Sequence, residues 1–355
     1  MNNFRVFKQV PRIIYGSGSI SRIKELLPKK DASNYNIYII DDIFRNTCFP
    51  GKDNISDEDI LEWFPASLGE PKTSQVDSIR DNIRQRQINS EPNAIIGIGG
   101  GSTLDVAKAL SVILCNEESS SKYQGWDLVP NPGLYKIGIP TISGSGAEAS
   151  RTAVLFGKDK KFGINSDSSM FDALILDCDL IEGVPLQQRF HSGMDCYIHC
   201  VESITGTFIN ELARGNASKA LELCERVFLC NGSNDELMTA SYMGGVSIVN
   251  SEVGICHALS YGLSLELGIR HGLANCIVFN VLDDFYGPYV DRYRQMLEKN
   301  MIRLPHDVCK TLDSMAMSRM VKMTLRMERP LANALGINWR ERLTEDMIRD
   351  LYIQM

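Results

Sequence analysis

One stretch constrains the fold more than any other, because an apolar run, a cluster of glycines and a helical pattern follow one another directly. The apolar run covers residues 94–96, the glycines lie at positions 97 and 99–101, and small and apolar residues alternate as far as Lys108. A buried strand that turns through glycines into a helix is the opening of a βαβ unit. Bare glycine backbone lets a phosphate approach, and the free N–H groups of the helix N-terminus hold its charge. The motif matches neither G-x-G-x-x-G nor the lysine P-loop, so a phosphate cradle and a simple tight turn both stay open.

The hydrophobic pattern changes near residue 183. Before it, short apolar runs alternate with polar helical stretches such as residues 73–86, which is typical of a parallel sheet. These runs cover residues 36–40, 94–98, 137–139 and 173–176. After Pro185 helical periodicity dominates, for example over residues 217–229 and 237–249. We therefore predict an α/β plus all-α fold, with a Rossmann-like dinucleotide-binding domain over residues 1–183 and a helical metal- and substrate-binding domain over residues 184–355.

Two further segments carry local predictions. Residues 117–132 contain a serine run and two prolines, which predicts a surface loop and not a domain linker. Thr344 is followed by acidic residues, as at the N-cap of a helix, so a last helix is expected to begin there.

Composition excludes several classes of protein. A chain of 355 residues is long for one core, and 44% hydrophobic with 23% charged residues is typical of a globular protein. No apolar run is long enough to span a membrane, and residues 1–5 lack a signal-peptide core. The net charge of −7 argues against a nucleic-acid partner. The 10 cysteines show no paired C-x-x-C spacing, which favours reduced thiols in a cytoplasmic protein.

Four residues have the makings of a divalent-metal site. Asp195 and His199 stand four apart, so on a helix they share one face, and His257 and His271 flank a later apolar segment. These positions hold three of the 5 histidines in the chain. Three imidazoles and one carboxylate suit Fe²⁺ or Zn²⁺ and leave a position free for water or substrate. Each histidine taken alone is more often an ordinary core or surface residue.

Two other features indicate a dinucleotide. Residues 139–148 repeat the pattern of an apolar strand followed by hydroxylic and glycine residues, including Thr141 and Ser143. The strand at residues 36–40 ends in Asp41 and Asp42. A carboxylate in this place accepts hydrogen bonds from ribose hydroxyls and repels a 2′-phosphate. NAD is thus expected over NADP, although a solvated turn would also explain the two acids.

Together these motifs resemble the iron-containing alcohol dehydrogenases, which share the dehydroquinate-synthase-like fold. They run in the order of that family from about Arg12 to the terminal helix. The resemblance implies a metal-dependent alcohol dehydrogenase that works as a homodimer on a small molecule. It implies the catalytic metal ligands Asp195, His199, His257 and His271. For the cofactor it implies Asp42 at the ribose, Gly99, Gly100, Gly101 and Ser102 at the pyrophosphate, and Thr141 and Ser143 along the cleft. Asp105 is a further expected cofactor-binding residue.

The mechanism that the resemblance implies has two parts. The metal lowers the pKa of the alcohol hydroxyl, and hydride passes from the alcohol carbon to the nicotinamide. Many relatives carry a further histidine four residues after the third ligand, where this chain has Tyr261. The hydroxyl of tyrosine titrates near 10. The route of the proton therefore stays open among Tyr261, His191, the cofactor ribose and water.

Three departures from the family pattern bear on the substrate. Ile248 stands where relatives often have an aromatic residue, Glu252 lies in a usually small and apolar stretch, and Arg151 follows the second glycine loop. A guanidinium there would recognise an anionic group, unless it is a surface residue. These features predict a sugar acid or polyol, and they most resemble the family members that oxidise the C8 hydroxyl of 3-deoxy-manno-octulosonate (Kdo) for lipopolysaccharide synthesis. A short-chain alcohol or polyol dehydrogenase, a dehydroquinate-synthase-like lyase and a non-catalytic nucleotide-binding protein are the alternatives.

Overall fold

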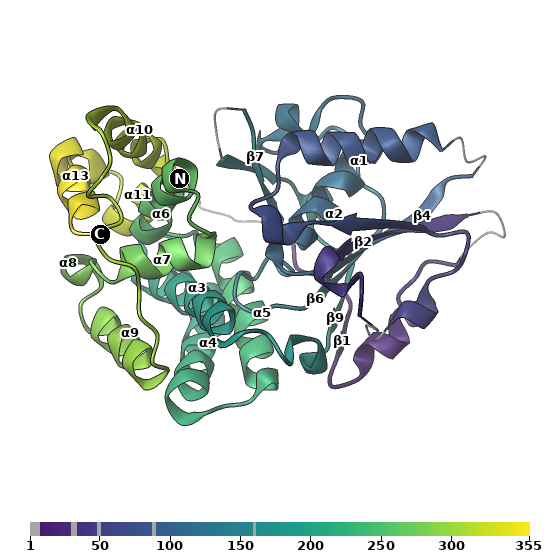
Figure 1. Cartoon of the computed structure of the whole chain (residues 1–355), viewed down its shortest axis with the longest axis horizontal. Helices are drawn as coiled ribbons and strands as arrows, with labels where there is room; N and C mark the ends of the chain where they lie inside the picture. The colour runs from purple at the N-terminus through teal and green to yellow at the C-terminus, as the bar shows by residue number, and fades with distance from the viewer. Residues whose placement is uncertain (1–7, 30–33, 48–50, 87–89, 159–160) are drawn as a thin grey trace. The chain divides into compact units, whose positions relative to one another are not determined.

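The computed structural model describes residues 8–29, 34–47, 51–86, 90–158 and 161–355 (Figure 1). The chain forms two compact units. The first consists of Met1–Ile142 and Ala147–Gly183, and the second of Ser143–Gly146 and Val184–Met355. The short segment Ser143–Gly146 thus leaves the first unit and packs within the second, which the sequence pattern did not predict. The expected absence of a signal peptide at residues 1–5 lies outside the described residues.

The first unit is built on a six-stranded sheet in the order β1-β9-β6-β4-β2-β3, and each neighbouring pair is parallel. Its strands are β1 (Ile13–Tyr15), β9 (Ala173–Leu176), β6 (Lys136–Pro140), β4 (Pro92–Gly99), β2 (Tyr35–Asp41) and β3 (Ile60–Phe64). The helices α1 (Thr73–Gln85) and α2 (Gly101–Leu114) belong to the same unit. This arrangement confirms the predicted parallel-sheet fold.

Burial explains why these strands read as unbroken apolar runs. All seven residues of β2 are buried, and the five residues of β6 are buried as well. A parallel strand covered on both faces has no reason to alternate polar and apolar residues. On one face Tyr38, Ile96 and Ile137 pack against Ile20 and its neighbours from the segment after β1.

The parallel arrangement brings the expected cofactor residues of the first unit to one edge. The carboxyl ends of the adjacent strands β2, β4 and β6 lie at Asp41, Gly99 and Pro140. Ligands of such sheets bind beyond these ends. The backbone N–H of Thr141 donates to the carbonyl of Gly99 over 3.0 Å, which links the two glycine-bearing loops.

The predicted surface loop at residues 117–132 is partly wrong. It contains a short 3-10 helix (Ser120–Tyr123) and strand β5 (Gly125–Trp126), which pairs in parallel with β8 (Lys161–Asn165). The strand β7 (Thr152–Phe156) pairs with β8 in the antiparallel sense and completes a second, three-stranded sheet. A two-residue strand has too little periodicity to be seen in sequence, because its identity depends on its distant partner.

The second unit is helical, as predicted (Figure 1). Its helices are α3 (Leu186–Thr205), α4 (Glu211–Cys230), α5 (Asn234–Ser251), α6 (Ile255–Leu267), α7 (His271–Phe279), α8 (Asp283–Tyr286), α9 (Pro288–Lys299), α10 (Ser314–Leu325), α11 (Glu328–Leu335), α12 (Trp339–Arg342) and α13 (Glu345–Ile353). Helices α3, α4 and α5 pack on one another. The last helix begins as expected, with the Thr344 side chain accepting from the N–H of Met347.

Among the described residues, no helix combines the length and the apolar character needed to cross a membrane. The nine described cysteines are free thiols, and Cys196 and Cys200 are both buried.

Candidate functional site

Helix α3 supplies the first half of the candidate metal centre. Asp195 and His199 lie one turn apart and are both buried, with 2% and 4% of their surfaces exposed. Helix α6 contributes His257, and His271 is the first residue of α7. Three helices of the second unit therefore bring all four predicted ligands together.

The ligand atoms converge on one carboxylate oxygen. The Nε2 atoms of His257, His199 and His271 lie 3.3, 3.6 and 3.7 Å from Asp195 Oδ1. Ligand atoms of Asp195, His257 and His271 all fall within 4.8 Å of one another, while His199 lies outside this closest set. The rings of His199 and His257 are stacked, with their centroids 4.5 Å apart.

This donor set fits a divalent cation. Atoms that each carry a lone pair would repel one another at such distances unless they share a positive charge. The ring atom Nδ1 of His199 is buried without a hydrogen-bond partner among the described residues, so nothing in the described part of the chain fixes the proton of that ring. Nitrogen and carboxylate ligands in this number suit Zn²⁺ and Fe²⁺ equally, so the geometry does not choose between them.

The pKa shifts in the site follow from burial and from charge. Burial alone raises the pKa of Asp195, but the surrounding imidazoles outweigh it and lower this pKa below its usual range. Burial lowers the pKa of His199 to about 4, against the pull of Asp195. Burial also disfavours the charged form of His257, yet Glu202 and Asp195 overcome this and raise its pKa to about 9. The site thus holds two buried carboxylates, those of Asp195 and Glu202, whose negative charge a bound cation would neutralise.

Glu202 is part of this site and was missed in the sequence. It is 1% exposed and follows His199 by three positions on α3. Its Oε2 atom lies 2.6 Å from His257 Nδ1 and accepts from the N–H of Gly254 over 2.7 Å. Its Oε1 atom accepts from the N–H of Cys256 over 2.6 Å. The spacing of Asp195, His199 and Glu202 on one helical face was the signal available in sequence.

Asn275 was also missed, although it stands four residues after His271 on α7. It is fully buried, and its Nδ2 atom lies 2.7 Å from Asp195 Oδ1, 3.1 Å from His257 Nε2 and 3.3 Å from His271 Nε2. Its Oδ1 atom is buried without a hydrogen-bond partner among the described residues. The amide therefore faces the same point as the ligand atoms.

The candidates for proton transfer lie beside His271. The ring of Tyr261 on α6 meets the ring of His271 edge-on, with centroids 5.8 Å apart. His191 on α3 packs its backbone against Gly272, where an added Cβ would lie 2.9 Å from the carbonyl oxygen of His191. The Nε2 atom of His191 is buried without a hydrogen-bond partner in the described residues, and burial lowers its pKa.

The segment Ser143–Gly146 is held closely within the second unit. The N–H of Gly144 donates to Ser241 Oγ over 2.8 Å. A Cβ on Gly144 would lie 1.8 Å from the carbonyl oxygen of Ser192, so this position has no room for a side chain. Ser143 is 3% exposed, and its hydroxyl has no hydrogen-bond partner among the described residues.

The first glycine loop has the geometry expected of a phosphate cradle. Gly100 is the N-cap of α2, and Gly101 and Ser102 form its first turn. A Cβ on Gly99 would lie 2.6 Å from Thr103 Oγ1, so the strand and the helix approach too closely for a side chain. Free N–H groups at such a helix start attract a phosphate.

Asp105 forms a buried ion pair one turn into α2. Its Oδ1 atom lies 2.8 Å from Lys108 Nζ, and Oδ2 accepts from the N–H of Val154 over 3.0 Å. The same ammonium group donates to the carbonyl of Ala147 over 2.9 Å and contacts Ser150 Oγ at 3.3 Å. The pair therefore holds α2 against the chain that follows the second loop. Asp105 acts within the protein in this structure, whereas the sequence placed it at the cofactor.

The two acidic residues at the end of β2 have different surroundings. Asp41 is buried and its carboxylate accepts from the N–H of Ile43. Asp42 begins the next short helix and is partly exposed. Only Asp42 therefore has a side chain placed to meet a ligand from solvent.

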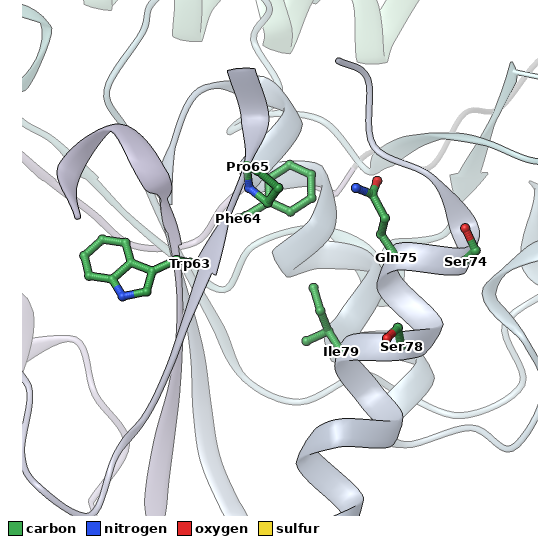
Figure 2. A pocket seen from close by; sticks show the side chains of 7 residues that line it. All are labelled: Trp63, Phe64, Pro65, Ser74, Gln75, Ser78 and Ile79. Carbon is green, nitrogen blue, oxygen red and sulfur yellow. The ribbon is translucent and has the colours of Figure 1, made fainter. Parts of the chain in front are cut away.

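A pocket of about 300 Å³ lies between α1 and β3, the edge strand that pairs with β2 (Figure 2). Trp63, Phe64 and Pro65 border it at the end of β3. Ser74, Gln75, Ser78 and Ile79 of α1 form its other wall. The lining includes none of the residues expected to bind the cofactor.

Two of the residues expected to recognise the substrate, Arg151 and Glu252, form ion pairs within the protein. The guanidinium of Arg151 is paired with Asp127 and, over 3.2 Å, with Asp167. Glu252 ends α5 with a positive φ of 106° and pairs with Arg329 over 2.5 Å. Ile248 lies one turn earlier on α5 and accepts the N–H of Glu252 at its carbonyl. These contacts favour a structural role for Arg151 over anion recognition.

Comparison with protein families gives matches over most of the chain. The pattern described as iron-containing alcohol dehydrogenase matches residues 11–178. The pattern described as the C-terminal part of the Fe-containing alcohol dehydrogenase family matches residues 189–342.

Individual relatives agree with these matches. Sulfoacetaldehyde reductase of Bilophila wadsworthia is 40% identical over 200 residues, which are 53% of this chain and 52% of that protein, so the chain spans about half of its length. Among solved structures, an iron-containing alcohol dehydrogenase from Thermococcus thioreducens is similar with a TM-score of 0.80 at 22% identity, over 98% of both chains. Sulfoacetaldehyde reductase from Bifidobacterium kashiwanohense, solved in complex with NAD⁺, has a TM-score of 0.79 at 20% identity, also over 98% of both chains.

Proposed function

The chain belongs to the iron-containing alcohol dehydrogenase family, and on this premise we propose that it is a metal-dependent dehydrogenase acting on a polar, anionic primary alcohol. The reaction converts the alcohol and NAD⁺ to the aldehyde, NADH and one proton. The observation that carries the proposal is the convergence of three imidazole Nε2 atoms on Asp195 Oδ1 within 3.7 Å. The N-terminal domain, residues 1–183, would bind the dinucleotide, and the C-terminal domain would hold the metal and substrate.

Asp195, His199, His257 and His271 would hold the metal. A divalent ion there supplies Lewis-acid chemistry, which lowers the pKa of an alcohol hydroxyl toward neutrality. Burial of Asp195, His199 and His257 supports the role, since a dry site strengthens the effect of the charge. His271 is partly exposed. Fe²⁺ and Zn²⁺ are both compatible with the ligands.

For the cofactor, the α2 N-terminus with Gly99, Gly100, Gly101 and Ser102 would bind the pyrophosphate. Thr141 and Ser143 would contact the remainder of the dinucleotide. Asp42 would accept hydrogen bonds from the ribose hydroxyls and repel a 2′-phosphate, which favours NAD over NADP. The unpartnered hydroxyl of Ser143 supports this assignment.

The proton of the alcohol leaves toward His191 or Tyr261 in our proposal. Burial keeps His191 neutral near pH 7, so its unpartnered Nε2 can accept a proton. The ring of Tyr261 meets that of His271 edge-on, and its hydroxyl can donate a hydrogen bond to water or to the ribose. His191 is the better acceptor because its imidazole is unprotonated near pH 7, whereas a tyrosine hydroxyl, which titrates near 10, still holds its proton.

The substrate proposal rests on the departures in sequence and on one relative. The C8 hydroxyl of Kdo is the first candidate, because Ile248 stands where relatives often have an aromatic residue and Glu252 brings a charge into a usually small and apolar stretch. The second candidate is a short anionic alcohol, since the 40% identical relative is a sulfoacetaldehyde reductase. Cytoplasmic location and a homodimer stay predictions.

The test measures NADH formation by absorbance with Kdo, 2-hydroxyethanesulfonate, 4-hydroxybutyrate, ethanol and butanol. Each substrate is tried with NAD and NADP, on protein loaded with Fe²⁺ or Zn²⁺ and on chelated protein. We expect metal-dependent reduction of NAD, with kcat/KM higher for an anionic alcohol than for ethanol or butanol.

Each alternative gives another result in the same assay. Faster oxidation of butanol than of any anionic alcohol supports a general alcohol dehydrogenase. Phosphate release from a phosphorylated sugar acid, without net NADH, identifies a lyase. Binding of NAD without turnover of any alcohol or sugar acid contradicts the enzymatic proposal.

A further inference from the structure

We propose that Glu202 is a positioning residue that fixes His257 in the tautomer with its proton on Nδ1, and so presents Nε2 as a metal ligand. This inference rests on the metal centre proposed above and assigns a role to a residue outside the ligand set. Glu202 Oε2 lies 2.6 Å from His257 Nδ1, while His257 Nε2 faces Asp195 Oδ1 at 3.3 Å. A hydrogen bond at one ring nitrogen determines which nitrogen is free to bind a metal.

The surroundings of Glu202 allow only an ionised carboxylate. Both of its oxygens accept backbone N–H groups, from Gly254 at Oε2 and from Cys256 at Oε1. The hydroxyl of Tyr286 adds a third donor, 3.0 Å from Oε1. Each oxygen accepts from a backbone N–H group whose direction is fixed. An N–H₂ group at either position would therefore place two donors against each other.

The same contacts fix the backbone that carries His257. Gly254 is the N-cap of α6, and Cys256 and His257 lie in its first turn. Glu202 therefore caps α6 from a different helix and also benefits from the helix dipole. A Cβ on Gly254 would lie 3.1 Å from Glu202 Oε1 and 2.9 Å from the Tyr286 hydroxyl, so the close approach needs glycine.

Asn275 gives independent support for this tautomer. Its Nδ2 atom lies 3.1 Å from His257 Nε2, and an amide N–H₂ can only donate. In the neutral imidazole that binds a metal, Nε2 then offers its lone pair and the proton lies on Nδ1. The contacts at both ends of the ring thus specify one tautomer.

A purely structural cap would also place a carboxylate here, so the test separates the two roles. Glu202→Gln keeps the shape but forces an N–H₂ group against Cys256 N–H or against the His257 ring. The matched control is Tyr286→Phe, which removes one donor to Oε1 and leaves the contact to His257. We expect Glu202→Gln to weaken Zn²⁺ binding to metal-free protein by roughly 10- to 100-fold, as is typical for such partners of metal ligands. Tyr286→Phe should change it by less than about twofold while still lowering Tm.

The unmodified protein supplies a second measurement that needs no variant. With ¹⁵N-labelled histidine and Zn²⁺, NMR should show the His257 proton on Nδ1 and the metal on Nε2. A proton on Nε2, or equal Zn²⁺ affinities for Glu202→Gln and the unmodified protein, would overturn the role of Glu202. If His271→Ala also binds Zn²⁺ as the unmodified protein does, the metal centre itself is wrongly placed. If only His271→Ala loses Zn²⁺, the centre stands and the inference about Glu202 fails alone.

Discussion

Replacing Lys108 by methionine tests whether the buried ion pair in α2 holds the first unit together. The Lys108 side chain is fully buried, and its partner Asp105 is 12% exposed. Lys108 Nζ lies 2.8 Å from Asp105 Oδ1 and also donates to the carbonyls of Ala147 and Thr152. Methionine has a similar length but neither charge nor donor, so it leaves a buried carboxylate and two carbonyls without this partner.

The size of the effect follows from these contacts. Removing one partner of a buried pair lowers the free energy of unfolding by about 3–5 kcal/mol. For a domain of this size, 1 kcal/mol shifts Tm by about 2–4 °C, so Lys108→Met should lower Tm by about 6–20 °C. Because the ammonium group also joins α2 to residues 147–152, we expect weaker binding of NAD. Circular dichroism on heating measures Tm, and titration with NADH fluorescence measures the affinity.

Two controls make this prediction refutable. Lys122→Met removes an exposed lysine and should change stability by less than about 0.5 kcal/mol. Asp105→Asn combined with Lys108→Met removes the unpaired charge, so the double variant should lose less than the sum of the two single changes. A Lys108→Met protein whose Tm falls by no more than that of Lys122→Met would refute the reasoning.

The remaining predictions concern the site. His271→Ala should abolish turnover and lower the metal content measured by elemental analysis; normal metal and rate would show that the ligands are misassigned. Asp42→Gly should raise KM for NAD and relax discrimination against NADP, and equal use of both cofactors by the unmodified protein would contradict the role of Asp42. Since Asp127 and Asp167 already hold its guanidinium, Arg151→Ala should change kcat/KM for a sugar acid and for an uncharged alcohol to a similar extent; a loss of tenfold or more for the sugar acid alone would restore Arg151 as an anion-binding residue.

The sequence by itself determined the features that depend on local spacing. The apolar runs predicted β2, β4, β6 and β9 because strands buried on both faces need unbroken apolar residues. Asp195 and His199 could be paired because a helix places residues four apart on one face. The glycine loop before α2 was visible for the same reason, since its turn and its helix are adjacent in the chain.

The tertiary structure decided which distant side chains meet. Glu202 contacts His257, which is 55 residues away in sequence, and no local pattern predicts a partner at that separation. Arg151 looked available for an anion until the fold paired it with Asp127 and Asp167. A side chain's chemistry fixes what it can bind, but packing between helices and strands fixes which partner lies within hydrogen-bond distance, and only long-range contacts specify that packing.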